Sequence, residues 1–295
     1  MDLRELLEQR PVLVGDGAMG TQLMARGLSA GECGERWNVE NPDAVQDIQR
    51  EYVEAGADYL LTNTFGANPI ALGRHGLAEE TEAFNRAAVE IARRAAGGQA
   101  LVFGDVGPTG GLLEPFGTLT EGEVLSAFAR QVAALVQAGA DVVICETFES
   151  SGELRLALRA ARDCCDVPLI ASMKFTPEPS GRYRSMMGEG PEQVIGVAEE
   201  CRCAAVGTNC GQGIATMPDL AAELARLRSG DTPIIVQPNA GVPKLVSGET
   251  VYPESPSDFA EVLPALYRAG ARIIGGCCGT TTEHIGAIRR FADSL

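Results

Sequence analysis

The 295-residue sequence is short of basic residues and of long apolar runs. It has 24 Lys and Arg against 40 Asp and Glu, a net charge of −16, and no cluster of basic residues. Because binding to phosphate groups requires concentrated positive charge, this composition argues against a nucleic-acid-binding protein. No apolar run reaches the roughly 18 residues of a membrane span. We therefore expect a protein that binds neither nucleic acid nor membranes.

Signs of secretion are also lacking. The N-terminus, MDLRELLEQRPVLV, has acidic residues where a signal peptide has a basic start, and no long apolar segment follows. An odd number of cysteines, nine, does not suggest a disulfide framework. We expect a cytoplasmic protein, in which thiols are buried small residues or metal ligands. The hydrophobic content of 45% is that of a globular protein with a sizeable core.

Short β-rich apolar runs alternate with helical patterns along the whole chain. The runs are PVLVGD, DYLLTNT, ALVFGDV, DVVICET, PLIASMK, AAVGTNC, PIIVQPN and RIIGGCC. Their nearly continuous hydrophobicity is typical of parallel strands that are buried on both faces. Eight strand–helix units over this length, with no linker between them, predict a single-domain (β/α)8 TIM barrel over residues 1–295. An open doubly wound sheet is the alternative fold.

Helix boundaries can be predicted from capping residues. Several helical patterns end on AGA just before the next strand, which places a glycine at the helix stop. Asn41, Thr120 and Ser257, the last from the SPSD stretch, are the predicted N-caps.

Polar or thiol residues close nearly every predicted strand. A TIM barrel builds its active site at the carboxyl ends of its strands, so these residues would meet at one rim. They are Asp16, Asn63, Asp105, Glu146, Lys174, Cys210, Asn239 and the pair Cys277-Cys278. We therefore expect the functional site at this end of the barrel.

Three cysteines stand out within this rim. Cys210 ends the sixth strand, and Cys277 and Cys278 end the eighth, where neighbouring glycines free the backbone to turn both thiols to one side. Three thiolates with one open position are typical of a catalytic zinc site. The alternatives are inert buried cysteines or a vicinal disulfide, for which the sequence offers no oxidising role. We expect the other cysteines to be buried or incidental.

The motifs along the chain resemble those of a known family. They are DGAMGTQL, TNTFGAN, GDVGPTG, ETF, GTNC, PNAGVP and GGCCGTT, in this order over residues 8–292. In these motifs the chain is similar to the homocysteine-binding methyltransferase domain family, and most similar to the N-terminal module of cobalamin-dependent methionine synthase. The resemblance implies a barrel fold, homocysteine as the substrate and methionine biosynthesis as the function.

The resemblance also implies roles for individual residues. Zinc would be bound and the acceptor thiol activated by Cys210, Cys277 and Cys278. Asn239 would supply an oxygen ligand to the zinc that the substrate thiol displaces. The remaining substrate-binding residues are implied to be Asp16 and Glu146, which hold the amino group of homocysteine, and Gly17 and Ala18, whose amides face its carboxylate.

The methyl donor does not follow from the residues themselves. The resemblance implies methylcobalamin carried on a separate corrinoid protein, with betaine or S-methylmethionine as the alternative donors. The loop FTPEPSGRYRSMMGEGPE departs from the pattern of the family, which leaves the acceptor thiol open. Two other classes are a zinc-dependent barrel hydrolase, for which His and Asp ligands are missing, and a non-catalytic zinc- or thiol-binding module. His75 and His284 are expected at the surface or in a helix cap, not as bases.

Overall fold

Eight parallel strands form one sheet that curves into a nearly closed barrel. The computed structural model describes residues 3–246 and 249–295, so the predicted domain's residues 1–2 and 247–248 lie outside the described part. The hydrogen-bonded order of the strands is β1–β12–β9–β8–β5–β4–β3–β2. Their bounds are β1 (Leu13–Val14), β2 (Tyr59–Leu61), β3 (Leu101–Val106), β4 (Val142–Phe148), β5 (Leu169–Met173), β8 (Ala205–Gly213), β9 (Ile234–Asn239) and β12 (Ala271–Ile274). Every predicted strand is present, and the open-sheet alternative is wrong.

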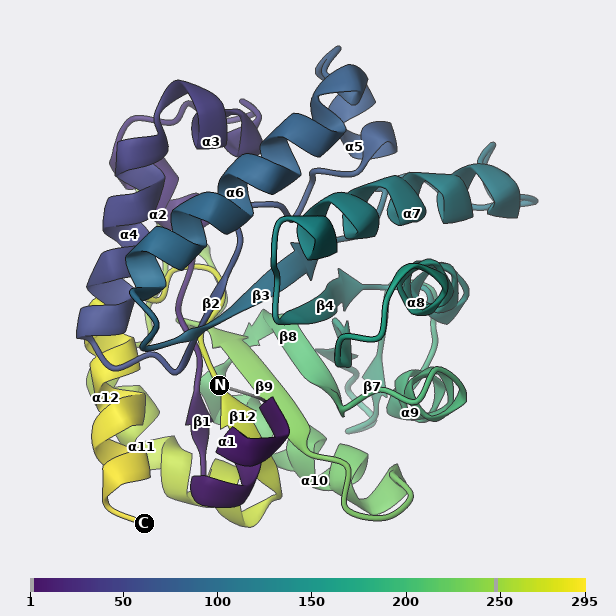
Figure 1. Ribbon diagram of the computed structural model, residues 1–295. Helices are drawn as coiled ribbons and strands as arrows, with labels where there is room; N and C mark the ends of the chain where they lie inside the picture. The colour runs from purple at the N-terminus through teal and green to yellow at the C-terminus, as the bar shows by residue number, and fades with distance from the viewer. Residues whose placement is uncertain (1–2, 247–248) are drawn as a thin grey trace.

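Helices surround the barrel on its outer face (Figure 1). One helix follows each strand of the barrel: α4 (Pro42–Glu54), α6 (Thr81–Ala96), α7 (Glu121–Gln137), α8 (Ser151–Cys164), α9 (Pro191–Glu200), α10 (Met217–Leu227), α11 (Pro256–Arg268) and α12 (Thr282–Asp293). Shorter helices are α1 (Leu3–Gln9), α2 (Gly20–Ala25), α3 (Trp37–Glu40) and α5 (Pro69–Gly73), with 3-10 turns η1 (Gly34–Arg36), η2 (Ala78–Glu80) and η3 (Ile214–Thr216). Among the described residues, no helix is long and apolar enough to cross a membrane.

The seam between β1 and β2 is closed by aspartate side chains. The backbone amide of Asp58 donates to the carbonyl of Val14 at 2.7 Å, and its carboxylate accepts from the Val14 amide at 2.8 Å. Two residues after Val14, the Asp16 Oδ2 atom accepts a hydrogen bond from the Leu61 amide at 2.8 Å. Between β1 and β2, which form no regular ladder of backbone hydrogen bonds in the described structure, carboxylates therefore accept the hydrogen bonds of the backbone amides.

The two largest apolar clusters lie inside the barrel and between its strands and the helices, and a third, small cluster surrounds Leu72 and Phe84. The inner cluster contains alternate strand residues, among them Leu101 and Phe103 of β3 and Ile144 of β4. Tyr59 stacks on Phe103 with ring centroids 4.2 Å apart. The intervening residues, such as Val102, belong to the outer cluster. This alternation decides which strand-end side chains point to the barrel axis.

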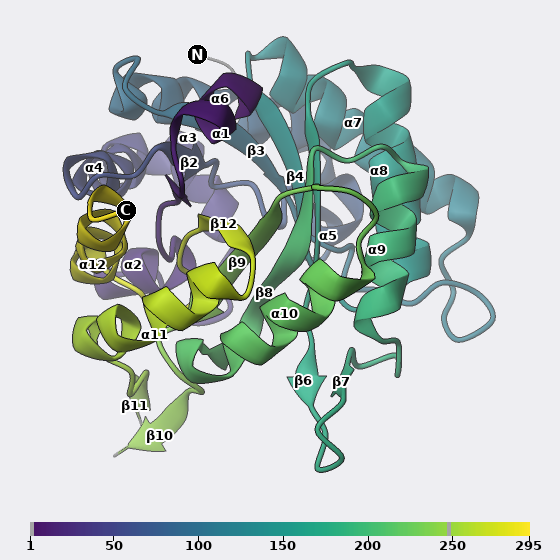
Figure 2. The ribbon, with the colours of Figure 1, turned by 90° about the horizontal axis from the view of Figure 1, so that it is seen from below.

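Leu3 and Leu6 of α1 join the inner cluster and cover the amino end of the barrel. Two hairpins that the sequence analysis did not predict lie at the opposite end: β6 (Thr176–Pro177) with β7 (Tyr183–Arg184), and β10 (Lys244–Val246) with β11 (Glu249–Val251). Figure 2 shows both hairpins projecting from the end opposite α1. They extend the loops that follow β5 and β9.

Helix boundaries follow the capping residues, with one correction. The glycines of the AGA stretches, Gly56, Gly139 and Gly270, have φ near +100 to +110° and follow α4, α7 and α11. Thr120 caps α7 in a capping box with Glu123. Asn41 is the N-cap residue of α4, without a side-chain hydrogen bond.

The predicted cap Ser257 is wrong, because the N-cap of α11 is Ser255. The hydroxyl of Ser255 accepts from the Asp258 amide at 3.3 Å, and the Asp258 carboxylate accepts from the Ser255 amide at 2.6 Å. Pro256 then occupies the first helical position. An N–H group there would have no partner within the helix, so a proline costs no hydrogen bond. Ser257 therefore lies inside the first turn.

Candidate functional site

The three cysteines of the predicted site come together at the carboxyl end of the barrel. The Sγ atoms of Cys210, Cys277 and Cys278 lie within 4.8 Å of one another, and all three residues are half-buried. Cys210 comes from β8, and the other two follow β12, so the grouping depends on the closed barrel. Among the described residues, this is the cluster whose donors lie close enough to hold a metal ion.

Local backbone geometry brings these thiols together. Ala205 of β8 belongs to the inner cluster, so strict alternation would turn Cys210 away from the axis. Its φ of +61° and an irregularity in the ladder between Asn209 and Gly213 redirect it. The strand does not end at Cys210, as predicted, but continues to Gly213. A non-glycine residue at positive φ is costly and is retained where the surroundings require it.

The loop that carries the other two cysteines is fixed by backbone hydrogen bonds to β9. The Cys277 amide donates to the carbonyl of Pro238 at 2.8 Å, and the carbonyl of Cys278 accepts from the Ala240 amide at 2.9 Å. Gly276 and Gly279 lack the space for a side chain, because a Cβ atom would come within 2.3 Å of Thr280 Oγ1 or 2.1 Å of Tyr252 Cγ. The cysteine pair is therefore held in a packed loop.

Hydrogen bonds between the thiols shift their pKa values apart. The Cys210 and Cys277 side chains form hydrogen bonds to Cys278 and lower its pKa to about 3. The hydrogen bonds of Cys277 to Cys210 and to Cys278, and then its burial, raise the pKa of Cys277. Because like charges so close together repel each other, ionising all three thiols requires a cation beside them.

Asn239, the last residue of β9, presents a free acceptor near these sulfurs. Ile235 of the same strand faces the barrel axis, so Asn239, four residues on, faces it too. Its side chain is only 3% exposed, and among the described residues its Oδ1 has no hydrogen-bond partner. A buried carbonyl oxygen without a donor is unfavourable by roughly 1–3 kcal/mol. The position therefore suits a residue that binds a ligand.

Asp16 and Glu146 are buried carboxyl groups at the same end of the barrel. Each has one oxygen, Asp16 Oδ1 and Glu146 Oε2, without a partner among the described residues. The Gln237 side chain hydrogen-bonds to Glu146. Burial is the main cause that raises the pKa of both groups, for Glu146 to about 8, and the nearby Cys210 charge adds to the shift of Glu146. A cationic ligand would lower both pKa values again.

Gly17 and Ala18 lie in a tightly packed segment between β1 and α2. A Cβ atom at Gly17 would lie 2.8 Å from the Tyr52 ring and 2.9 Å from Thr280 Oγ1. The Ala18 amide donates to Thr280 Oγ1 at 3.1 Å, and its carbonyl accepts from the Tyr52 hydroxyl at 2.8 Å. The Ala18 amide predicted to face a carboxylate is therefore engaged by Thr280 in the free protein.

Residues 252–254 form a strap over the cysteine loop that the sequence analysis missed. The Tyr252 ring packs on Gly279, and its hydroxyl hydrogen-bonds to Cys278. Burial and the charge on Cys278 raise the pKa of Tyr252 to about 12, so the phenol remains a donor at neutral pH. Glu254 accepts from the Ile214 amide at 2.7 Å, and its own amide donates to the Ala240 carbonyl at 2.9 Å. The strap ties β8 and β9 to the loop after β12.

The two histidines are placed largely as expected. His284 lies in the first turn of α12, where its Nδ1 accepts from the Thr281 amide at 3.1 Å and its Nε2 lies 3.1 Å from the Glu254 carbonyl. With Nδ1 an acceptor, Nε2 carries the proton and donates. His284 is therefore a buried capping residue that supports the strap, and His75 is exposed.

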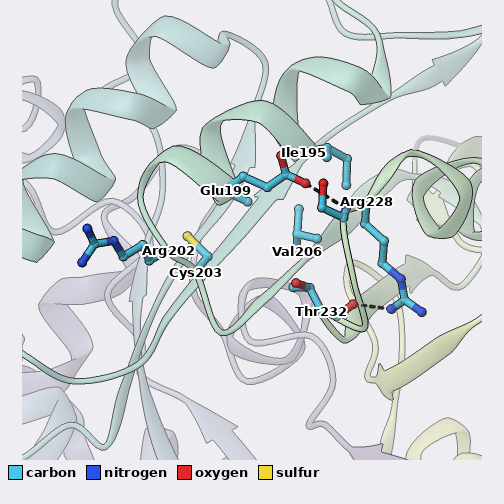
Figure 3. Close-up of a pocket in the computed structure, with 9 residues that line it drawn as sticks. Ile195, Glu199, Arg202, Cys203, Val206, Arg228 and Thr232 are labelled. Atoms are coloured by element: carbon cyan, nitrogen blue, oxygen red, sulfur yellow. Dashed lines mark hydrogen bonds between the residues drawn. The ribbon is translucent and has the colours of Figure 1, made fainter.

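A cavity of about 320 Å3 lies at the other end of the barrel, between α9 and α10 (Figure 3). It is lined by Val206, where β8 begins, and by Thr232, just before β9. Its polar groups are already paired: Glu199 accepts from the Ser229 amide at 2.8 Å, and Arg228 donates to the carbonyl of Thr232. This end of a barrel contributes to stability and not to catalysis, so we assign the cavity no role.

The comparison with known sequences points to one family. A family model described as homocysteine S-methyltransferase matches residues 13–292. Methionine synthase from Mycobacterium tuberculosis is 33% identical over 302 residues, which cover 96% of this chain and 25% of that protein. Homocysteine S-methyltransferase from Escherichia coli is 32% identical over 317 residues, 97% of each chain. The chain thus spans about a quarter of the methionine synthases that it matches.

Solved structures agree with the sequences. The metallated form of the homocysteine methyltransferase MmuM from Escherichia coli superposes with a TM-score of 0.81 at 28% identity, covering 98% of this chain and 99% of that one. A pyruvate carboxylase from Rhizobium etli, with a TM-score of 0.55 at 13% identity, shares the fold alone.

Proposed function

Since the chain belongs to the homocysteine S-methyltransferase family, we propose that it transfers a methyl group to the thiol of homocysteine, giving methionine. The observation that carries the proposal is the group of three sulfurs beside two buried carboxyl groups at the carboxyl end of the barrel. The three sulfurs, with a metal ion between them, suit a thiol, and the two carboxyl groups suit an ammonium group. We assign residues 1–295 to this one barrel domain.

The residues at the mouth fit a zinc ion. Three thiols within 4.8 Å of one another and an amide oxygen without a partner are a donor set that zinc accepts. Cys210, Cys277 and Cys278 would hold the ion, with Asn239 as the fourth ligand until the substrate enters. When bound, zinc lowers the pKa of a thiol that it contacts, so that the thiol is ionised at neutral pH. The Tyr252 strap supports this arrangement by holding Cys278.

The other residues orient the acceptor. Asp16 and Glu146 accept hydrogen bonds from the ammonium group of homocysteine. The amides of Gly17 and Ala18 face its carboxylate once Thr280 releases the Ala18 amide. Positioned in this way, the acceptor sulfur attacks the methyl carbon of the donor. The S–C bond forms as the bond between the methyl group and the donor breaks, and the electron pair of that bond leaves with the donor. Holding both reactants in line accounts for much of the rate.

We propose a methyl-corrinoid protein as the donor. The similarity of 96% of this chain to methionine synthase, together with the resemblance of its motifs to the cobalamin-dependent enzyme, supports this donor. Exposed apolar side chains on the loops and hairpins at the carboxyl end of the barrel support a partner of protein size. They are Leu112, Phe116, Met186, Leu245 and Val246. A free small molecule such as S-methylmethionine or betaine is the second candidate, favoured by the end-to-end match to the Escherichia coli enzyme.

A panel of donors tests the proposal. The zinc-reconstituted protein is mixed with homocysteine and methylcobalamin, free or protein-bound, and loss of the methyl group is followed by absorbance. Parallel reactions contain S-methylmethionine or betaine and are assayed for methionine. Demethylation of the corrinoid supports the proposal, whereas methionine from a small donor alone assigns that donor. No methionine with any donor contradicts the proposed function.

A further inference from the structure

Asp105 is a third buried carboxyl group at the barrel mouth, beyond the two that the family resemblance implies. On β3, Leu101 and Phe103 face the inside of the barrel, and Val102 and Val106 face the helices. Because side chains alternate along a strand, Asp105 faces the barrel axis directly above Phe103. Glu146 has the same orientation on neighbouring β4, where Val142 and Ile144 face inward. The two carboxyl groups therefore point into one space.

The backbone of Asp105 is held firmly while its carboxyl group is free. Its amide donates to Thr62 Oγ1 at 3.0 Å, and its carbonyl accepts from Thr64 Oγ1 at 2.7 Å. The residue is 5% exposed, and its Oδ1 has no hydrogen-bond partner in the part of the chain that the structure describes. A buried polar atom without a partner calls for an explanation such as a ligand.

Nearby negative charges make the ionised Asp105 carboxyl group unfavourable in a purely structural role. Burial and then the repulsion of Glu146 and Asp16 raise its pKa well above the usual value. Each of the three residues has an oxygen without a partner, namely Asp16 Oδ1, Asp105 Oδ1 and Glu146 Oε2. Three such oxygens near one another destabilise the free protein, and a cation between them removes that penalty.

We propose that Asp105 accepts a hydrogen bond from the ammonium group of the acceptor amino acid, together with Asp16 and Glu146. An ammonium group has three N–H donors, and three carboxyl groups with one free oxygen each can receive them. This inference rests on the proposed function, because it names a further residue for the same acceptor. It makes Asp105 a determinant of selectivity for thiols that carry an amino group over those that lack one.

The test compares two thiols. Binding of homocysteine and of 4-mercaptobutyrate, which lacks the amino group, is measured by calorimetry on the zinc-reconstituted wild type and on Asp105→Asn. Loss of a charge-assisted hydrogen bond is expected to weaken homocysteine binding by about 10- to 100-fold. Binding of 4-mercaptobutyrate is expected to change by less than about twofold, since it makes no such bond. The selectivity ratio is therefore the readout.

Thr208→Val is the matched control. Thr208 is fully buried on β8, and its Oγ1 also lacks a partner among the described residues. Ala205 of the same strand faces the barrel axis, and Val206 faces the helices. Because side chains alternate along a strand, Thr208 faces the helices as Val206 does. This variant is expected to bind both thiols as the wild type does. Asp105→Ser provides a second variant if Asp105→Asn does not fold.

Each outcome decides between the claims. If the affinities for both thiols fall in parallel in the Asp105 variants, or if neither affinity changes, Asp105 has no role in selectivity and the inference is refuted. If the wild type itself does not bind homocysteine, the proposed function is refuted instead. A lower selectivity ratio in the Asp105 variants, with the control unchanged, supports the inference.

Discussion

Replacing Glu146 by Gln should stabilise the free protein and weaken its binding of homocysteine. The carboxyl group has a pKa of about 8 in the fold against an ordinary value of 4.5, mainly because it is buried. Well below pH 4.5 it is neutral in the folded and the unfolded state alike. As the pH rises, the unfolded state loses its proton first, so the folded state loses stability until the pH passes about 8.

The size of this effect follows from the shift. A pKa raised from 4.5 to about 8 corresponds to a ceiling of about 5 kcal/mol at high pH. Gln is neutral at every pH and retains an oxygen that can accept from Gln237. Relaxation of the protein around the charged carboxylate reduces the effect below this ceiling. We therefore expect the free energy of unfolding of the variant to exceed that of the wild type by at least about 1 kcal/mol at pH 9, and by little at pH 5.

The assay is urea unfolding of the metal-free protein at the two pH values. Glu90→Gln is the control, because it makes the same substitution at an exposed position of α6. Calorimetry on the zinc-reconstituted protein is expected to show homocysteine binding weaker by about 10- to 100-fold in Glu146→Gln. A variant that is less stable at pH 9 and binds homocysteine normally would refute the reasoning, since Glu146 would then be a structural residue.

Further variants separate the roles of the other residues. Cys277→Ala should lose zinc, measured by metal analysis, together with methyl transfer; a metal-free wild type that still methylates homocysteine would contradict this. Asp16→Asn should weaken homocysteine binding by about 10- to 100-fold with zinc content unchanged, because Asn can still accept from the Leu61 amide. Tyr252→Phe should lower zinc affinity by about 10-fold or more, measured by competition with a chelator, since it removes a hydrogen bond to a ligand. Equal affinity in the two proteins would mean that the phenol does not act on Cys278.

Much of the fold could be predicted because its signals are local. Eight apolar runs with helices between them specify the barrel, and glycines such as Gly56 and Gly139 mark helix ends through their positive φ. The cap of α11 is harder to predict because SPSD offers two serines, and only the position of Pro256 as the first helical residue decides between them. The two hairpins were missed because their strands are short and mostly exposed, which leaves no apolar alternation to detect.

The site could be predicted only in part, for a related reason. The grouping of the three cysteines follows from strand order and the glycines around Cys277 and Cys278. What could not be predicted is the turn at Cys210, because a positive φ at a non-glycine residue leaves no mark in the sequence. The free oxygen of Asp105 and the strap at Tyr252 depend on contacts between distant segments, which no local pattern records.

Methionine formation from homocysteine is the most direct test of the central claim. The zinc-reconstituted wild type and Cys277→Ala are incubated with homocysteine and the full donor panel, and methionine is quantified by mass spectrometry. We expect methionine from the wild type with at least one donor, and none above background from the variant. No methionine from the wild type with any donor, or equal amounts from both proteins, would contradict the assignment of this site.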